Sequence, residues 1–101
     1  MGRTDWTELK SRKLAAMTDT ERAEYDEAYA AAQLAASVGE QIRAAREAAG
    51  LSQRELAQRM GTSQAAVGRL ETGGVGATLT TLQRVASALG LKVDIELRPS
   101  A

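Results

Sequence analysis

The strongest constraint on the fold is a pair of short helices whose start and stop signals lie within residues 51–73. Ser52 is followed three residues later by Glu55, the spacing of a capping box, in which each side chain satisfies the other residue's free backbone N–H. Gly61 is expected to end this helix, because glycine readily adopts the left-handed conformation that terminates helices. A second capped helix is expected over residues 63–71. Two short helices joined by a tight turn leave the outer face of the second one free to enter a DNA major groove.

The segments on both sides of this pair are also helical by pattern. A short helix is expected over residues 5–16. Apolar residues then recur at helical spacing, which predicts either one helix over residues 19–49 or two helices with a joint at Gly39. The glycine-rich stretch 72–76 predicts a loop, and a further helix is expected over residues 79–89.

The C-terminal segment has a different periodicity. Residues 91–97 alternate strictly between apolar and charged side chains, which predicts a β-strand. A lone strand leaves its backbone groups unpaired, so its expected mate is the same strand of a second chain, antiparallel across a two-fold axis. The alternatives are a tail packed on its own domain and pairing with a partner's sheet edge. The residues expected to form the dimer contact are Leu91, Val93, Ile95 and Leu97.

Composition argues against several classes of protein. The 101 residues include no Cys and no His, which excludes disulfides and thiolate-bound metals and removes the commonest general base. We therefore expect that the protein is not an enzyme and that it binds no metal and no cofactor. No apolar run approaches the roughly 20 residues that span a bilayer, and the N-terminus lacks the apolar core of a signal peptide. A soluble cytoplasmic protein without a membrane contact is expected.

The net charge is zero, with 13 basic and 13 acidic residues, but the charges are unevenly spread. Residues 19–27 contain five acids against Arg22 alone. Residues 39–77 contain five Arg against four Glu. Because phosphate neutralisation dominates affinity for nucleic acids, a DNA-binding face is expected in the second region and not in the first.

Polar and apolar residues follow a specific order in the central segment. It contains Leu51-Ser52-Gln53, Glu55-Leu56-Ala57, Gly61-Thr62-Ser63-Gln64, Val67 and Leu70-Glu71-Thr72-Gly73. This order resembles the helix-turn-helix of lambdoid phage repressors, Cro proteins and the wider XRE family, and with the flanking helices the resemblance covers about residues 38–90. It implies a mainly α, lambda-repressor-like bundle, here with an N-terminal helical arm and one C-terminal β-strand paired in a dimer.

The resemblance also implies roles for individual residues. Gln53 would touch a phosphate, while the outward face of the second helix would read bases. Arg69 would pair with guanine or, alternatively, form a surface ion pair with a nearby Glu. Arg43, Arg54 and Arg59 are phosphate candidates or ordinary surface residues. The expected DNA-binding set is Arg43, Gln53, Arg54, Thr62, Ser63, Gln64, Ala65, Gly68 and Arg69.

The order of arm, XRE domain and ALGLKVDIEL ending resembles HigA-type antitoxins of type II toxin–antitoxin pairs. That resemblance implies a bacterial, nucleoid-associated autorepressor that binds operator DNA as a homodimer and neutralises a small HigB- or RelE-like ribonuclease toxin. The expected domains are an arm over residues 1–37, a DNA-binding domain over 38–90, and a strand with tail over 91–101. The expected partner-binding residues are Trp6, Leu9, Tyr25 and Tyr29.

Three other functions compete with this one. A plain XRE-family repressor, phage-derived or chromosomal, would lack the toxin. An interaction module would have lost DNA binding. An enzyme is the weakest alternative, because no paired carboxylates follow a recognisable cleft pattern.

Overall fold

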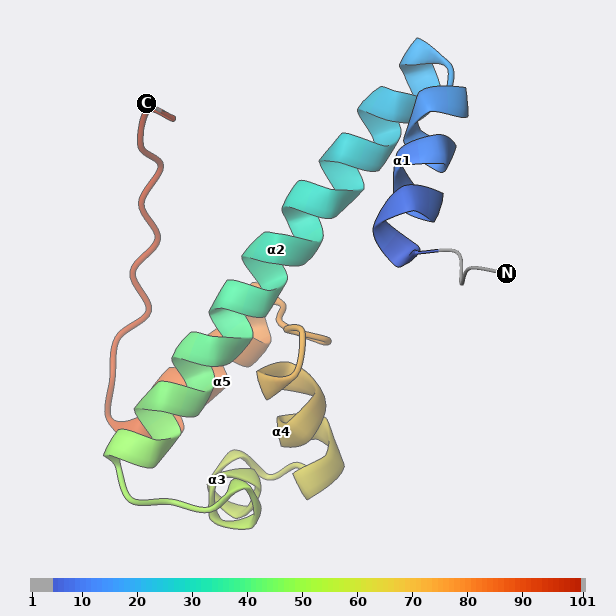
Figure 1. The fold of residues 1–101 in the computed structure, drawn as a ribbon. Helices are drawn as coiled ribbons and strands as arrows, with labels where there is room; N and C mark the ends of the chain where they lie inside the picture. Colours follow the sequence, from blue (N-terminus) through green and yellow to red (C-terminus); the bar gives the residue numbers. More distant parts are fainter. Residues whose placement is uncertain (1–4, 101) are drawn as a thin grey trace. The chain divides into compact units, whose positions relative to one another are not determined.

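The computed structural model describes residues 5–100, and within that range the chain forms five α-helices (Figure 1). It divides into two compact units, residues 1–32 and residues 33–101, and the long helix α2 contributes to both. The expected boundary at 37/38 falls inside this helix, five residues beyond the division at 32/33. The helices are α1 (Trp6–Ala16), α2 (Asp19–Ala48), α3 (Gln53–Met60), α4 (Gln64–Glu71) and α5 (Leu79–Leu89).

The second unit has a small aliphatic core. Leu56 of α3 and Val67 of α4 are completely buried and lie at its centre. Full burial of one such side chain contributes roughly 1.5–3 kcal/mol to folding. Ile42 brings α2 into the same cluster and Val85 brings in α5. The core therefore holds α3 and α4 in a fixed mutual position, which is what a surface helix needs if it is to present side chains to a ligand.

Helix α2 runs unbroken through Gly39, so the alternative with a joint at that residue is wrong. Packing explains the glycine. A Cβ at Gly39 would lie 2.6 Å from the Leu70 carbonyl oxygen and 2.8 Å from that of Glu71. Gly74 makes a similar close approach, because a side chain there would collide with the backbone of Ala35. These two glycines let the end of α4 and the following loop pack directly on α2.

Local capping signals fix the helix ends, as the sequence predicts. The capping box at α3 is complete, since the Glu55 N–H donates to the Ser52 hydroxyl and the Ser52 N–H donates to the Glu55 carboxylate, both at 3.0 Å. Gly61 and Gly90 adopt left-handed conformations and end α3 and α5. Ser63 is the N-cap of α4 and accepts a hydrogen bond from the Ala66 N–H, so the helix proper begins at Gln64.

The first unit is a pair of helical segments without a buried side chain among its described residues. Asp5 caps α1 by accepting a hydrogen bond from the Thr7 N–H at 3.2 Å. Thr18 caps the start of α2 by accepting one from the Glu21 N–H at 3.1 Å. These caps fix where the helices begin, but the unit contains no core comparable to that of residues 33–100.

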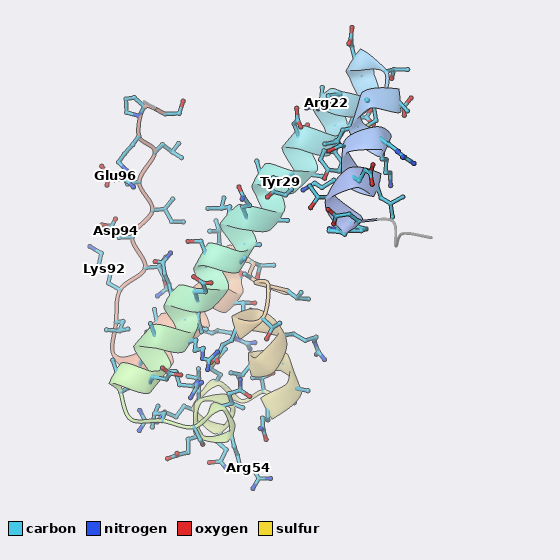
Figure 2. The ribbon with its side chains drawn as sticks, in the orientation of Figure 1. Arg22, Tyr29, Arg54, Lys92, Asp94 and Glu96 are labelled. Carbon is cyan, nitrogen blue, oxygen red and sulfur yellow. The ribbon has the colours of Figure 1, made fainter. Side chains whose placement is uncertain are left out.

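The strand expected over residues 91–97 does not form in the single chain. Residues 91–100 have no regular secondary structure, and Leu97 is 96% exposed. The physical reason is that a strand needs a neighbour for its backbone N–H and C=O groups, and the described residues provide none. The alternation is still visible, because Lys92, Asp94 and Glu96 project from the same side of the tail (Figure 2). Pairing with a second chain stays a prediction.

Candidate nucleic-acid interface

Helices α3 and α4 are joined by a tight turn that leaves one face of α4 open to solvent. The Thr62 N–H donates to the Ala57 carbonyl at 2.9 Å and closes the turn. Val67, Leu70 and Glu71 are the buried residues of α4. The predicted base-reading residues lie outside this buried face: Gln64, Ala65 and Arg69 are exposed and Gly68 is half-buried.

Gln53 is the first residue of α3, and its side chain contacts α4. Its side-chain amide donates to the Glu71 carboxylate at 3.2 Å, and its carbonyl oxygen lies 3.8 Å from where a Cβ of Gly68 would be. The structure therefore brings the predicted residues Gln53 and Gly68 together. An amide nitrogen carries two hydrogens, so one stays available for a phosphate while the other holds the side chain in place.

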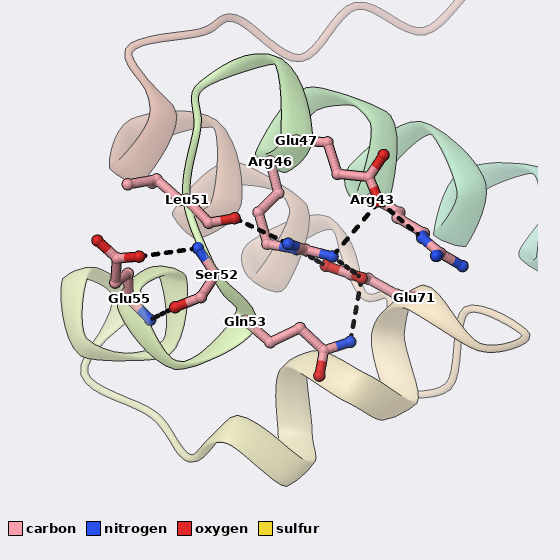
Figure 3. Close-up of polar contacts among 8 residues, drawn as sticks. All are labelled: Arg43, Arg46, Glu47, Leu51, Ser52, Gln53, Glu55 and Glu71. Carbon is pink, nitrogen blue, oxygen red and sulfur yellow. Dashed lines mark hydrogen bonds and ion pairs between the residues drawn. The ribbon is translucent and has the colours of Figure 1, made fainter.

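A buried ion pair between Arg46 and Glu71 fixes the carboxylate that Gln53 contacts (Figure 3). The Arg46 guanidinium donates to both carboxylate oxygens of Glu71, at 2.6 and 3.0 Å, and to the Leu51 carbonyl at 2.8 Å. The exposed fraction of the side chain is 2% for Glu71 and 11% for Arg46. One bidentate pair thus ties α2 to the end of α4 and to the residue that precedes the α3 cap.

The pKa values of these groups follow from their contacts. Burial alone would raise the pKa of Glu71, but the hydrogen bonds from Arg46 and Gln53 and the Arg46 charge outweigh it and lower that pKa below its ordinary value. The hydrogen bond to Glu71 raises the pKa of Arg46. The Ser52 N–H lowers the pKa of Glu55. All three groups are therefore charged at neutral pH.

Internal contacts occupy every acidic side chain between residues 42 and 90. This range contains six Arg and only three Glu. Glu71 pairs with Arg46, Glu55 closes the α3 capping box, and Glu47 accepts from the Arg43 Nε at 3.0 Å. No acid of this range forms an ion pair with Arg54, Arg69 or Arg84, and positive charge free of such pairing is the electrostatic requirement of a phosphate-binding surface.

Arg54, Arg69 and Arg84 form no ion pair within the part of the chain that the structure describes. The alternative in which Arg69 pairs with a nearby Glu is thus not observed. Figure 2 shows Arg54 projecting from α3 away from α4 and α5 of the second unit. Arg59 makes a long 3.4 Å hydrogen bond to the Ala88 carbonyl. Arg43, in contrast, is neutralised by Glu47, which makes it the least suited of the predicted phosphate contacts.

Arg84 is a candidate that sequence reasoning missed. It lines a shallow groove of about 190 Å³ together with Arg69, Thr62 and Thr81. This groove places two uncompensated guanidinium groups and two hydroxyl groups beside the exposed face of α4. The available signal was that Arg84 has no acid within four residues along its helix, so no intrahelical ion pair could neutralise it.

Comparison with known protein families identifies one match. A family model described as helix-turn-helix matches residues 42–95. Comparisons with curated proteins and with solved structures give no match. Among the described residues, no helix is long and apolar enough to cross a membrane.

Proposed function

The chain belongs to the helix-turn-helix family of the XRE type, a family of DNA-binding transcription regulators, and from this premise we propose that it is an autorepressing antitoxin. In this proposal α4 enters the major groove of the operator, and the helical arm binds a small ribonuclease toxin. The protein acts by binding in a bacterial cytoplasm and carries no catalytic site of its own.

One observation carries the DNA-binding half of the proposal: every acid of residues 42–90 is occupied internally, whereas the arginines beside α4 are not. Gln64 can pair bidentately with adenine, Arg69 with guanine, and Ala65 can contact a thymine methyl. Gln53 and the exposed Arg54 would bind phosphates on either side. Arg84, which shares a groove with Arg69, extends this phosphate-binding surface to α5.

Replacement of Arg69 by Ala tests the role of α4. If Arg69 reads a guanine, the variant loses about 1–3 kcal/mol of binding free energy on the operator and little on random DNA. Arg84→Ala should instead weaken binding to both duplexes and reduce the salt dependence. Arg43→Ala is the matched control, since Glu47 already neutralises that arginine. Equal losses for Arg69→Ala on operator and random DNA would show that Arg69 only contacts phosphate.

The toxin-binding half rests on the arm. Among its described residues, Trp6 is 75% exposed and Tyr29 is 47% exposed. Neither belongs to the core of the second unit. Large apolar side chains that are exposed together are typical of interaction surfaces. The acids of residues 19–27 suit a basic partner electrostatically.

A deletion separates the two halves of the proposal. Removal of residues 1–32 leaves every residue of the helix-turn-helix core in place, including Ala35, which packs against Gly74. We expect this variant to bind operator DNA nearly as well as the full chain and to lose neutralisation of the toxin encoded by the adjoining gene. Neutralisation by the truncated protein would refute the role of the arm, and an adjoining gene without a toxin would favour the plain repressor.

A further inference from the structure

The first unit contains an open pocket between α1 and the first turns of α2. Its volume is about 330 Å³, which lies at the lower end of the range for pockets that enclose small ligands or side chains. Its walls are largely apolar, and both charged groups on its rim are lysines. The lining residues are Trp6, Leu9, Lys10, Lys13, Leu14 and Tyr25.

Tyr25 lines this pocket and is ordered by a contact with Tyr29, which lies outside the lining. The rings of Tyr25 and Tyr29 are stacked with centroids 6.3 Å apart. The Lys10 ammonium lies 4.9 Å from the centroid of the Tyr29 ring, a cation–π contact that restrains this lysine. Trp6 and Leu9, which also line the pocket, remain 75% and 45% exposed. The pocket thus has one side chain, Tyr25, that is held by stacking, and two apolar side chains, Trp6 and Leu9, that stay largely exposed in the described unit.

The cations of α1 differ in their partners. Arg12 lies outside the pocket and pairs with Glu8 at 3.6 Å. Lys13 forms no ion pair among residues 5–100, and Lys10 contacts only the face of a ring. The pocket therefore combines apolar walls with two positive charges that lack an acidic partner. This combination complements an apolar side chain that has a carboxylate beside it.

The acidic residues of the first unit favour a protein over a nucleic acid as the partner. Residues 19–27 carry five acids against Arg22, and this field repels a nucleic acid. A protein partner can satisfy both charges: a leucine-like or aromatic residue beside Asp or Glu suits the pocket and its lysines, and basic residues elsewhere on the partner suit the acids of residues 19–27. Its apolar side chain would fill the space between Trp6, Leu14 and Tyr25, and its carboxylate would reach the two lysines.

We propose that the pocket of the arm is the anchor point for the partner protein and takes an apolar side chain flanked by a carboxylate. This assignment rests on the proposed function in one respect, namely that the arm binds a protein. It adds a requirement that the acidic stretch alone does not impose: a basic toxin must present a local acidic and apolar element to this site.

Trp6 is the only tryptophan of the chain, so its fluorescence reports directly on the pocket. The probe is a capped six-residue peptide in which Leu alternates with Glu, titrated into the full-length protein. We expect a saturable change in Trp6 emission. The double variant Lys10→Gln/Lys13→Gln should bind at least tenfold more weakly, while Arg12→Gln, the matched control outside the pocket, should change the affinity less than twofold. Circular dichroism checks that the helix content is unchanged.

The assignment would be overturned by the absence of a saturable response, by an equal response to a peptide of alternating Leu and Lys, or by wild-type affinity in the double variant. A change in Trp6 emission with protein concentration alone would show that a second copy fills the pocket, and would overturn the partner assignment. In a second experiment the same variants are mixed with the product of the adjoining gene. Absence of a complex with the wild-type chain refutes the proposed toxin partner, whereas the peptide titration decides the pocket in either case.

Discussion

Replacement of Arg46 by Met removes the buried guanidinium while it keeps most of the side-chain volume. The variant loses two hydrogen bonds to Glu71 and one to the Leu51 carbonyl. The Glu71 side chain, only 2% exposed, then remains as a buried carboxylate whose one side-chain donor is Gln53. Loss of one partner of a buried ion pair costs about 3–5 kcal/mol, because the other charge is left without compensation.

Arg43→Met is the matched control, because it breaks an ion pair of the same helix on the surface. The side chains of Arg43 and Glu47 are 65% and 56% exposed, and exposed pairs four residues apart on a helix contribute about 0.3–0.5 kcal/mol. The two variants therefore differ by about 2.5–4.7 kcal/mol in the free energy of unfolding. Arg46→Lys keeps the charge without the bidentate geometry and should fall between them.

Urea unfolding monitored by far-UV circular dichroism measures these differences, with extrapolation to water. The loss in Arg46→Met should shrink as the pH falls below neutrality. Without Arg46, burial raises the pKa of Glu71 and the carboxyl becomes neutral more easily. A loss for Arg46→Met as small as that for Arg43→Met would refute the claim that this pair holds α2 to α4.

Three more outcomes follow from the same geometry. Gly39→Ala should destabilise the protein by at least about 1 kcal/mol in thermal unfolding, because its Cβ would meet carbonyl oxygens at 2.6 and 2.8 Å. Gly68→Ala should instead stabilise α4 by about 1 kcal/mol, because its Cβ would make an ordinary contact with the Gln53 side-chain oxygen at 3.8 Å. The lowered pKa of Glu71 contributes stability that is fully present above about pH 4.5 and is lost as the pH falls through the folded-state value, so acid titration of Glu71→Gln should show a shallower loss than the wild type. Ile95→Asp should shift the protein toward monomer in sedimentation and weaken operator binding, with Lys92→Ser, on the charged side of the tail, as the neutral control; an unchanged dimer would exclude the tail as the main interface.

Local signals explain why so much of the fold could be predicted from the sequence. The capping box of Ser52 and Glu55 and the terminating Gly61 act within a few residues, so each can be recognised without knowledge of the tertiary structure. The role of Gly39 could not be recognised, because the carbonyls that exclude its side chain belong to Leu70 and Glu71. The tail, in turn, lacks the hydrogen-bonding neighbour that its alternating pattern requires.

The candidate site, like the fold, could be predicted from the sequence only in part. The exposure of Gln64 and Arg69 follows from helical periodicity, because Val67 and Leu70 define the buried face of the same helix. Judged from the sequence alone, Glu71 adds a negative charge that disfavours DNA binding. In the structure it is buried against Arg46 and is therefore absent from the surface. Arg84 joins the site only because α4 and α5 both pack on α3 and line one groove, which is a tertiary arrangement that no local pattern encodes.

The most direct test of the central claim is the ratio of two affinities measured with the full-length protein at physiological salt. The first duplex is the tightest binder selected from a random pool, and the second is the same duplex with its sequence scrambled. If α4 reads base edges in the major groove, the selected duplex should bind at least about 10³-fold more tightly than the scrambled one. A ratio near one would contradict sequence-specific recognition by this helix.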